Sequence, residues 1–589
     1  MRTAAGAALA CFALRACAAV AVSTPANPEL TGVDYQWVFP DRGIMLSHHY
    51  NHGHASGFLP PNVSSWVNAS RPLQSNFLIS TMRTLKLGNY RYPGGGQCDW
   101  WDWRNETFGS AASSGQLQLG EAARKAFPSN ALGVAEFVAS AHAAGSAFLL
   151  TLDVSRPSPA SDVGIPALVA ERLGQPGSGN GLRFEMGSEV YGPTKGFPQP
   201  EGFSGAPAYV SAVTNLIRAA HALPGARVGV VTHPCPFVYP NGTGSGHGAG
   251  NCFDLKHGEI DRAHEWNRNL SRMCHERATR DEDRCDAVIV HIYKSQPSVL
   301  SHAKDEALMS AFLALGQATI DNAVGSLRRD YPSGTRLWVT EYNTLWEAAW
   351  HGAADAPSRT CSNCRPAVGR FFNGTENSAA HAVHVSGYLL AAMSHGDTVE
   401  VMNYHSFFEG PEFHQPPGVD NKGPGYYSTF VNQSGVYISA VAQVFGLFSQ
   451  WLRAEGATME SVLMPPNAAR VPFNLSKLSL FDGPVFCVHA AAICGRADAA
   501  GVGAASRVIA VNRCPFPATV PIGDACGGHA VGWHSIESFN ASLAEPGSMW
   551  ARLTDATPND GPMRPSRLPA GMGSDVEAAP LALSVVLLR

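Results

Sequence analysis

Short apolar runs alternate with longer segments of mixed polarity from about residue 43 to residue 450. Runs of this length predict buried strands, and the segments between them, with apolar residues three and four apart, predict helices. The clearest expected helices are 132–144, 208–223, 306–328 and 379–395. The expected strands are 43–47, 87–92, 147–153, 182–187, 227–232, 287–291, 336–340 and 399–404. Eight strands with interleaved helices predict an α/β fold, a (β/α)8 TIM barrel over residues 43–450.

The helical period disappears after about residue 455. Short alternating stretches follow at 477–480, 485–489, 507–512 and 581–588. They predict a C-terminal β-sandwich over residues 455–589. The stretch 28–40 is a candidate for one further strand of this sandwich, because chain ends often lie close together. The last apolar run is too short to cross a bilayer, so we expect no membrane span.

The N-terminus has the pattern of a secretory signal peptide over residues 1–23. Arg2 precedes an Ala-rich apolar stretch, and small residues suited to cleavage follow at 18–23. A short membrane anchor is the alternative. Nine Asn-x-Ser/Thr sequons predict a glycoprotein: they begin at Asn62, Asn68, Asn105, Asn241, Asn269, Asn373, Asn432, Asn474 and Asn540. We expect a protein that is secreted or that stays in the secretory pathway or a lysosome-like compartment.

Composition narrows the class of partner. The chain of 589 residues is 45% hydrophobic and only 15% charged, with a net charge of −5. Such a balance gives no indication of nucleic-acid binding, and the low charged fraction fits a surface made soluble partly by sugar. Nothing in the sequence fixes the oligomeric state.

Of the 13 cysteines, Cys11 and Cys17 would leave with the signal peptide. In an oxidising compartment, close spacing predicts local disulfides, although sequence alone does not fix their connectivity. The expected pairs are Cys235–Cys252, Cys274–Cys285, Cys361–Cys364, Cys487–Cys494 and Cys514–Cys526, with Cys98 left over. A redox or zinc motif is the alternative for Cys361 and Cys364.

Two glutamates carry the candidate chemistry. Glu189 and Glu341 each follow a short apolar run, and parallel barrels place their active sites where the strands end. The spacing, 341 − 189 = 152 residues, leaves room for about three strand–helix units, which puts the pair on the fourth and seventh strands. Two converging carboxylates, one protonated and one ionised, are the machinery of glycoside hydrolysis. A structural ion pair is the alternative for each glutamate.

Four motifs resemble those of the arabinofuranosidase and heparanase-like families of glycoside hydrolase clan A. Residues 91–96, Arg-Tyr-Pro-Gly-Gly-Gly, with the tryptophans at 100–103, resemble the second-strand motif. Residues 184–192 resemble the acid/base motif, 290–293 the sixth-strand motif and 339–343 the nucleophile motif. The resemblance spans about residues 43–410. It implies a retaining (β/α)8 hydrolase with an appended β-sandwich, in which Glu341 attacks the sugar and Glu189 is the general acid and base.

The same resemblance implies a set of residues around the substrate: Arg91, Ser188, His291, Tyr293 and Trp101. The alternative for Arg91 is a structural role that ties strands together, and the alternative for Trp101 is packing between the barrel and its loops. Ser188 stands where these families have an asparagine that bonds the sugar 2-hydroxyl, and serine offers one donor where the amide offers two. A catalytically weak glycan-binding barrel is therefore the alternative function.

No cofactor is expected. A histidine cluster at 48–54 resembles a metal site, but no acidic or thiol ligand stands among the histidines. We therefore expect no metal, and a carbohydrate as the partner.

Overall fold

The computed structural model describes most of the helices and strands of the chain and only some of its connecting segments. The described residues are 23–34, 83–94, 101–102, 107–108, 134–152, 154, 163–177, 179, 181–191, 203, 205–238, 257–293, 305–343, 379–405, 408–409, 429–432, 435–472, 485–495, 506–527, 530, 532–540, 550–553, 563 and 565–588.

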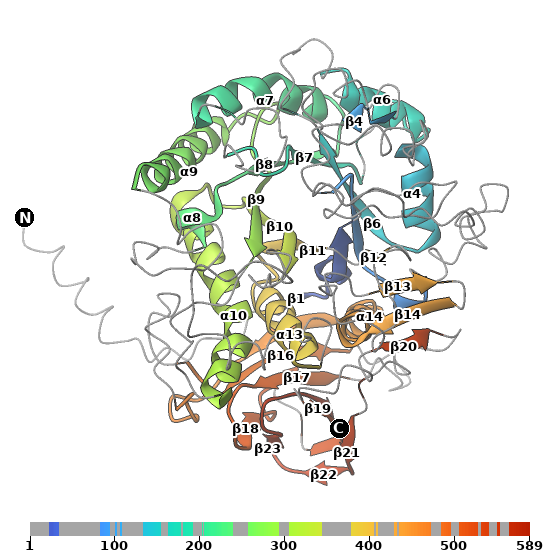
Figure 1. Cartoon of the computed structure of the whole chain (residues 1–589), viewed down its shortest axis with the longest axis vertical. Helices are drawn as coiled ribbons and strands as arrows, with labels where there is room; N and C mark the ends of the chain where they lie inside the picture. The colour runs from blue at the N-terminus through green and yellow to red at the C-terminus, as the bar shows by residue number, and fades with distance from the viewer. Residues whose placement is uncertain are drawn as a thin grey trace, which may run out of the picture.

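Eight parallel strands close into a barrel at the centre of Figure 1. In order around the barrel they are β2 (Gly32–Asp34), β3 (Asn89–Tyr92), β6 (Ala147–Leu152), β7 (Arg183–Met186), β8 (Arg227–Val231), β9 (Ala287–Tyr293), β10 (Arg336–Asn343) and β11 (Val399–Tyr404). Nearly every described residue of these strands is buried, which is why they read as apolar runs in the sequence. The predicted TIM barrel is confirmed.

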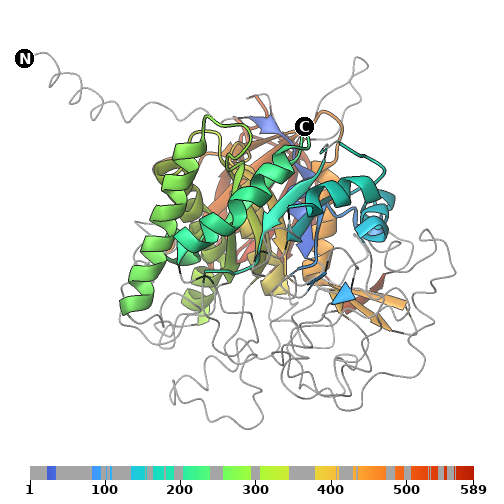
Figure 2. The same ribbon diagram turned by 90° about the horizontal axis from the view of Figure 1, so that it is seen from above.

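Helices surround the barrel, and Figure 2 shows the same arrangement from above. They are η1 (Pro28–Thr31), α4 (Val134–Ala143), α6 (Ile165–Arg172), α7 (Ala206–His221), α8 (Pro234–Phe237), α9 (His257–Arg277), α10 (Asp305–Asp330), α13 (Ala379–Ser394) and α14 (Ala440–Leu452). The four helices expected from the sequence are among them. Within the described part of the chain, no helix combines the length and the apolar character needed to cross a membrane.

The first barrel strand differs from the prediction. The expected strand 43–47 lies outside the described residues, and the first position of the barrel belongs to β2, Gly32–Asp34. This strand lies within the stretch 28–40, which the sequence offered only as a candidate strand of the sandwich. The strand that the N-terminal region contributes to the sandwich is β1 (Thr24–Pro25), which pairs with β15 (Thr458–Val462). A strand of three residues ending in a carboxylate is too short for a hydrophobic pattern to reveal. The other seven expected strands are confirmed.

The C-terminal β-sandwich is also confirmed. Its main sheet has the order β1-β15-β16-β17-β24-β19-β21, with β22 also paired to β19. The strands not yet placed are β16 (Val488–Cys494), β17 (Arg507–Asn512), β19 (Gly532–Asn540), β21 (Ser566–Leu568), β22 (Gly571–Met572) and β24 (Ala582–Leu588). A smaller sheet pairs β18 (Ala518–Pro521) with β23 (Asp575–Ala578).

Alternation along the strands of the main sheet creates two apolar cores. On β17, Ile509 and Val511 belong to the core that the sheet shares with the barrel. Val508 and Ala510 point the other way, into the core that includes β18 and β23. Successive strand residues face opposite sides of a sheet, so one strand serves both cores.

Two further small sheets complete the description. A four-stranded sheet joins β12 (Phe408–Glu409), β13 (Thr429–Asn432), β14 (Gly435–Ser439) and β20 (Trp550–Leu553). A two-stranded ribbon joins β4 (Trp101–Asp102) to β5 (Thr107–Phe108).

Helix α13 lies between the barrel and the main sheet of the sandwich (Figure 1). Every residue from Ala380 to Met393 is buried, which requires a helix that is apolar nearly all round. The helix packs closely against α10. A Cβ on Gly316 would lie 2.7 Å from the Tyr388 nitrogen, and one on Gly387 would lie 3.2 Å from the Leu313 oxygen. The absence of a side chain at both positions permits this approach.

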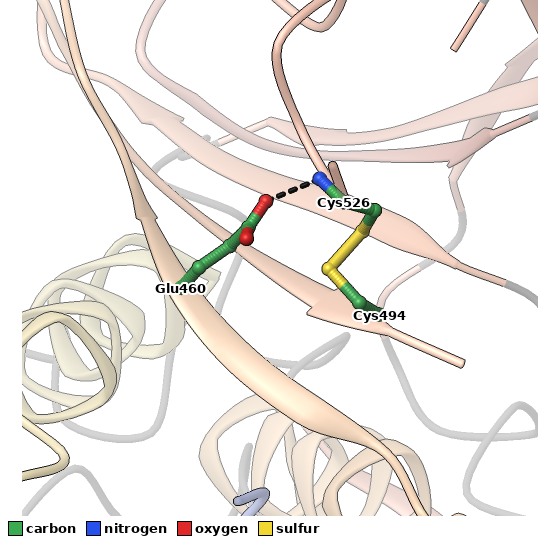
Figure 3. Close-up of side chains that lie close together, drawn as sticks. All are labelled: Glu460, Cys494 and Cys526. Atoms are coloured by element: carbon green, nitrogen blue, oxygen red, sulfur yellow. Dashed lines mark hydrogen bonds between the residues drawn. A yellow bond between two sulfur atoms is a disulfide. The ribbon is translucent and has the colours of Figure 1, made fainter. Parts of the chain in front are cut away.

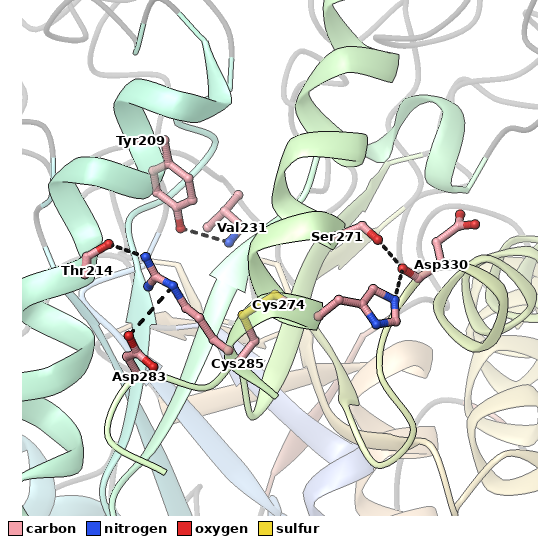
Figure 4. Close-up of a disulfide and its surroundings, with 10 residues drawn as sticks. Tyr209, Thr214, Val231, Ser271, Cys274, Asp283, Cys285 and Asp330 are labelled. Atoms are coloured by element: carbon pink, nitrogen blue, oxygen red, sulfur yellow. Dashed lines mark hydrogen bonds and ion pairs between the residues drawn. A yellow bond between two sulfur atoms is a disulfide. The ribbon is translucent and has the colours of Figure 1, made fainter. Parts of the chain in front are cut away.

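One predicted disulfide is confirmed and two are wrong. Cys274 bonds Cys285 and joins the end of α9 to the segment before β9, where Arg277 donates to the Thr214 hydroxyl at 2.7 Å (Figure 4). In the sandwich, the bonds are Cys487–Cys514 and Cys494–Cys526. Cys487 lies just before β16 and Cys494 is its last residue, about 23 Å away at about 3.3 Å per residue. Each therefore bonds a cysteine on a neighbouring segment.

Beside the second of these disulfides, the Glu460 carboxylate accepts a hydrogen bond from the Cys526 backbone (Figure 3). Cys235 is also disulfide-bonded. Its expected partner Cys252 lies outside the described residues, as do Cys98, Cys361 and Cys364.

Candidate active site

Seven ionisable side chains meet at the C-terminal ends of the barrel strands, where parallel barrels carry their chemistry. They are Asp34 at the end of β2, Arg91 on β3, Glu185 on β7, Glu189 just after β7, His291 on β9, Glu341 on β10 and His405 just after β11. Ser188, next to Glu189, lies with them.

Arg91 is the centre of this cluster. Its guanidinium is fully buried and donates from Nε and Nη2 to the two oxygens of Glu185, at 2.6 and 2.8 Å. Nη1 donates to Glu341 at 2.7 Å and to Asp34 at 3.2 Å, and Nη2 also lies 3.3 Å from the Ser188 hydroxyl. Burial alone would lower the pKa of Arg91, but the surrounding carboxylates raise it well above its ordinary value. Arg91 is therefore a permanent cation whose donors are all directed at acceptors.

Glu189 and Glu341 face each other across the site. A carboxylate oxygen of each, together with a ring nitrogen of His291, form a group whose atoms lie within 4.8 Å of one another. The two side chains differ in exposure: that of Glu341 is 5% exposed and that of Glu189 is 25% exposed. Two carboxyl groups at the same barrel end thus have different surroundings, one buried against Arg91 and one open to solvent.

The turn after β7 sets the position of Glu189. Gly187 has φ +86° and Glu189 has φ +50°, both in the left-handed region that non-glycine residues seldom adopt. A Cβ on Gly187 would lie 2.6 Å from Val154 and 2.7 Å from Val190, so the turn needs glycine there. A non-glycine residue keeps such a conformation only where the surrounding structure holds it in place.

His291 bridges the two candidate catalytic carboxylates. Its Nδ1 lies 3.2 Å from Glu189 and 3.5 Å from Glu341. Its Nε2 lies 3.0 Å from the Thr340 hydroxyl and 3.5 Å from Glu185. Burial alone would lower the pKa of His291, but Glu341, Glu185 and Glu189 outweigh burial and raise it to about 10. His291 is therefore a second cation of the site at neutral pH.

Asp34 and His405 form an ion pair inside the cluster, next to Glu341. His405 Nδ1 lies 2.5 Å from Asp34 and 4.0 Å from Glu341. Burial raises the pKa of Asp34 despite Arg91 and His405, and Glu341 and Asp34 raise the pKa of His405 against the effect of burial. The Asp34 carboxylate lies against Gly94, where a Cβ would come within 1.6 Å of Oδ1. The first glycine after the cis Tyr92–Pro93 bond is thus required by Asp34.

The structure brings together five of the residues expected from the sequence: Glu189, Glu341, Arg91, Ser188 and His291. Tyr293 is the last residue of β9 and Trp101 the first of β4, but the side chains of both lie outside the described part of the structure, as does the 48–54 histidine cluster.

Three members of the cluster were missed as site residues. Asp34 lies on the strand that the hydrophobic pattern did not reveal, and Glu185 lies inside the predicted strand 182–187 and not after its end. His405 directly follows the predicted strand 399–404, so the rule that chemistry lies at strand ends was a signal that pointed to it.

The site contains two sets of atoms close enough to share a metal ion: Asp34, Glu341 and His405, and Glu189, His291 and Glu341. Positive charge is already present at both. Arg91 donates to Asp34 and Glu341, and the raised pKa of His291 means that it holds a proton where a metal would need a free nitrogen. The arrangement does not favour a metal.

No family model matches the sequence, and no curated protein matches it. Solved structures do match over nearly the whole chain. A family 51 α-L-arabinofuranosidase from Bifidobacterium longum is 14% identical, with 97% of this chain and 98% of that one covered and a TM-score of 0.60. The GH51 arabinofuranosidase from Xanthomonas axonopodis pv. citri is 15% identical over 96% and 97% of the chains, with a TM-score of 0.56.

A third match, an α-L-arabinofuranosidase from Thermotoga maritima, is 12% identical over 97% and 98% of the chains, with a TM-score of 0.52. At such low identity, what the likeness establishes is the architecture. The chain has the fold of the clan A glycoside hydrolases, a (β/α)8 barrel followed by a β-sandwich.

Proposed function

We propose that the protein is a retaining O-glycoside hydrolase that acts on a polysaccharide or glycoconjugate by double displacement. One observation carries the proposal: carboxylate oxygens of Glu189 and Glu341 lie within 4.8 Å at the catalytic end of the barrel. Retaining glycosidases hold their carboxyl groups about 5 to 5.5 Å apart, whereas inverting enzymes leave about 6.5 to 9.5 Å for a water molecule. The fold shared with glycosidases supports the same conclusion.

Glu341 has the surroundings of a nucleophile. Arg91 lies 2.7 Å from one of its oxygens and His291 lies 3.5 Å from the other, and cations at these distances stabilise a carboxylate. In the first step Glu341 attacks the anomeric carbon and the glycosidic C–O bond breaks. The product is a covalent glycosyl-enzyme on Glu341.

Glu189 has the surroundings of the general acid and base. It gives its proton to the leaving oxygen in the first step. It then takes a proton from the water that attacks the anomeric carbon, which frees Glu341. Its side chain is 25% exposed, so both the leaving group and the incoming water can reach it.

The charges of the cluster are not balanced. Four carboxylates (Asp34, Glu185, Glu189 and Glu341) surround three cations (Arg91, His291 and His405). With both histidines protonated, the cluster therefore has one negative charge in excess, since 4 − 3 = 1.

A catalytically weak glycan-binding barrel is the second candidate. Ser188 favours it, because the asparagine of the resembled families would reach the sugar 2-hydroxyl with an amide. Here the shorter Ser188 hydroxyl lies 3.3 Å from an Arg91 donor. Contacts to that hydroxyl supply several kcal/mol in glycosidases.

Hydrolysis of a panel of aryl glycosides tests the proposal. Arabinofuranosides come first, because the matched structures are arabinofuranosidases, followed by glucuronides, xylosides and galactosides. We expect Glu341→Ala to abolish turnover on every substrate. We expect Glu189→Ala to retain turnover on dinitrophenyl glycosides, which need no protonation, and to be accelerated by azide with retained configuration.

Each alternative gives a different result. If Glu341→Ala were the variant that keeps turnover on dinitrophenyl glycosides and is accelerated by azide, the roles of the two glutamates would be reversed. Binding of oligosaccharides without any hydrolysis would favour the glycan-binding barrel.

We also propose that the protein enters the secretory pathway and is secreted or held in a lysosome-like compartment. The three disulfides Cys274–Cys285, Cys487–Cys514 and Cys494–Cys526 support an oxidising environment. Mass spectrometry of the protein isolated from its native source, before and after deglycosylation, tests both the loss of residues 1–23 and the use of the sequons.

A further inference from the structure

We propose that Glu185 is a positioning residue: its carboxylate holds Arg91 and His291 in place and supplies the negative charge that sets the pH range of catalysis. The proposal rests on the glycosidase function proposed above. Glu185 is four residues before Glu189 on the same segment, but its side chain is fully buried against Arg91.

The contacts of Glu185 use both of its oxygens. Oε2 accepts from Arg91 Nε at 2.6 Å and from the Thr151 hydroxyl at 3.3 Å. Oε1 accepts from Arg91 Nη2 at 2.8 Å and from the Thr340 hydroxyl at 3.1 Å, and lies 3.5 Å from His291 Nε2. The bidentate pair fixes the plane of the guanidinium, so that Nη1 remains directed at the nucleophile.

The same carboxylate orients His291. One ring nitrogen faces Glu185 and Thr340, which leaves Nδ1 to face Glu189 and Glu341. Both cations of the reaction centre thus have one side on Glu185 and the other side on the catalytic pair. A single buried residue thus contacts both of these cations.

Glu185 also supplies a constant charge. Burial alone would raise its pKa, but Arg91 and His291 lower it below the ordinary value. Glu185 therefore stays ionised throughout the working pH range, and its charge acts on every titrating neighbour. The ionisable groups around it are Asp34, Arg91, Glu189, Tyr209, His291, Glu341 and His405.

Replacement by glutamine keeps the shape and removes the charge. A lost negative charge favours ionised carboxylates and neutral imidazoles, so every neighbouring pKa moves down. Both limbs of the pH–activity profile should therefore shift to lower pH, by about one unit for a charge at this distance. The amide also points NH2 at a donor of Arg91 or of a threonine, which displaces Arg91 from Glu341 and lowers kcat by about 10²-fold.

The experiment compares Glu185→Gln with Asp286→Asn. Asp286 is a matched control, because it is a buried carboxylate that contacts His221 at 2.9 Å and Arg284 at 2.8 Å. It precedes β9 at the opposite end of the strand that carries His291. The measurements are kcat, KM and the pH profile on the best aryl glycoside, and the His291 titration by NMR of histidine-labelled full-length protein.

We expect Glu185→Gln to lower kcat with little change in KM, to shift both limbs to lower pH and to lower the pKa of His291. Asp286→Asn should destabilise the fold without moving the limbs. Unchanged limbs in Glu185→Gln, or a loss of kcat no greater than in Asp286→Asn, would overturn the proposal.

Two further outcomes are informative. If Glu185→Gln does not fold, Glu185→Asp replaces it; that variant keeps the charge with a shorter reach, so kcat should fall while the limbs stay in place, and shifted limbs would count against the proposal. If the wild-type protein hydrolyses no glycoside, the proposed function fails. The His291 titration then decides the role of Glu185 by itself: a lower pKa in Glu185→Gln supports it and an unchanged one refutes it.

Discussion

The two ends of the barrel each carry a network of arginines and carboxylates, and the networks differ in charge balance and in exposure. At the N-terminal end of the strands, Arg183 contacts Glu29 and Glu400, and Arg227 also contacts Glu400. Two cations thus face two carboxylates, all partly exposed. At the C-terminal end, three cations face four carboxylates, and apart from Glu189 nearly all of their surface is buried.

The N-terminal network packs against a buried tryptophan and has a structural role. Glu400 accepts from the Trp338 indole at 3.0 Å, and the Arg227 guanidinium lies 5.9 Å above the same ring. Each group is neutralised by a neighbour, and the network joins η1, β7, β8, β10 and β11. The C-terminal network has the same kinds of residue but one carboxylate in excess. The balanced charges of the N-terminal network join strands, whereas the excess negative charge of the C-terminal network surrounds the candidate catalytic pair.

The largest expected effect comes from removing the central cation of the catalytic end. Arg91→Met leaves Asp34, Glu185 and Glu341 without their guanidinium, and an uncompensated buried charge costs about 3–5 kcal/mol. We expect a large fall in the thermal unfolding temperature and aryl-glycosidase activity at the background level. A variant as stable as wild type would show that these carboxylates do not depend on Arg91.

The next effect tests the contact between Gly94 and Asp34. Gly94→Ala would place a methyl group 1.6 Å from the Asp34 carboxylate, so Asp34 must move and His405 with it. We expect a loss of about 1–3 kcal/mol from overpacking and a fall in activity of about 10²-fold from displaced charges. Gly325→Ala is the control, because nothing lies within 4 Å of its Cβ. In that exposed helical position alanine should stabilise by up to about 1 kcal/mol.

The third effect is a dependence of stability on pH. The pKa of His291 is raised from 6.5 to about 10 in the folded protein, so its contribution is complete below pH 6.5 and is lost as pH rises toward 10. Over this interval one proton corresponds to a slope of up to about 1.4 kcal/mol per pH unit. We expect His291→Gln to be less stable at pH 7 and to lose stability less steeply between pH 7 and 9.5, as measured by urea unfolding. An unaltered slope would mean that His291 is not charged in the folded protein.

The smallest effect is expected at the other end of the barrel. Arg183→Met removes a side chain that is 15% exposed. Its two partners keep other contacts: Glu400 still pairs with Arg227, and Glu29 still accepts from Asn89. Partly exposed pairs contribute little, so we expect a loss of no more than about 1 kcal/mol. The pH–activity profile should not change. A shifted profile would show that the two networks are coupled through the barrel and that the contrast between them is false.

The sequence predicted most of the barrel because buried parallel strands have nearly continuous apolar sequences, as in 227–232 and 399–404. It placed Glu189 and Glu341 correctly at strand ends for the same reason. It missed β2, since three residues that include Asp34 carry no hydrophobic signal. Asp34 was lost as a site residue together with its strand.

The sequence was also a poor guide to pairing at a distance. The sandwich disulfides depend on which ends of β16 and β17 lie side by side, and that is a property of sheet register. Likewise, Glu185 looked like an ordinary strand residue, because its importance comes from Arg91, 94 positions earlier in the chain. Contacts of this kind are decided by closure of the barrel, which no local pattern records.

Helix α13 limits how far this protein can be divided. It connects in sequence to the barrel, but its buried surface also contacts strands of the sandwich, and β1 at the start of the described chain pairs with β15. A truncated chain that ends before residue 455 would expose an apolar helix and an unpaired strand. The two halves, although distinct in architecture, are therefore not exchangeable modules: they should unfold in one cooperative transition, and a chimera that borrows a foreign sandwich must bring its own counterpart of α13.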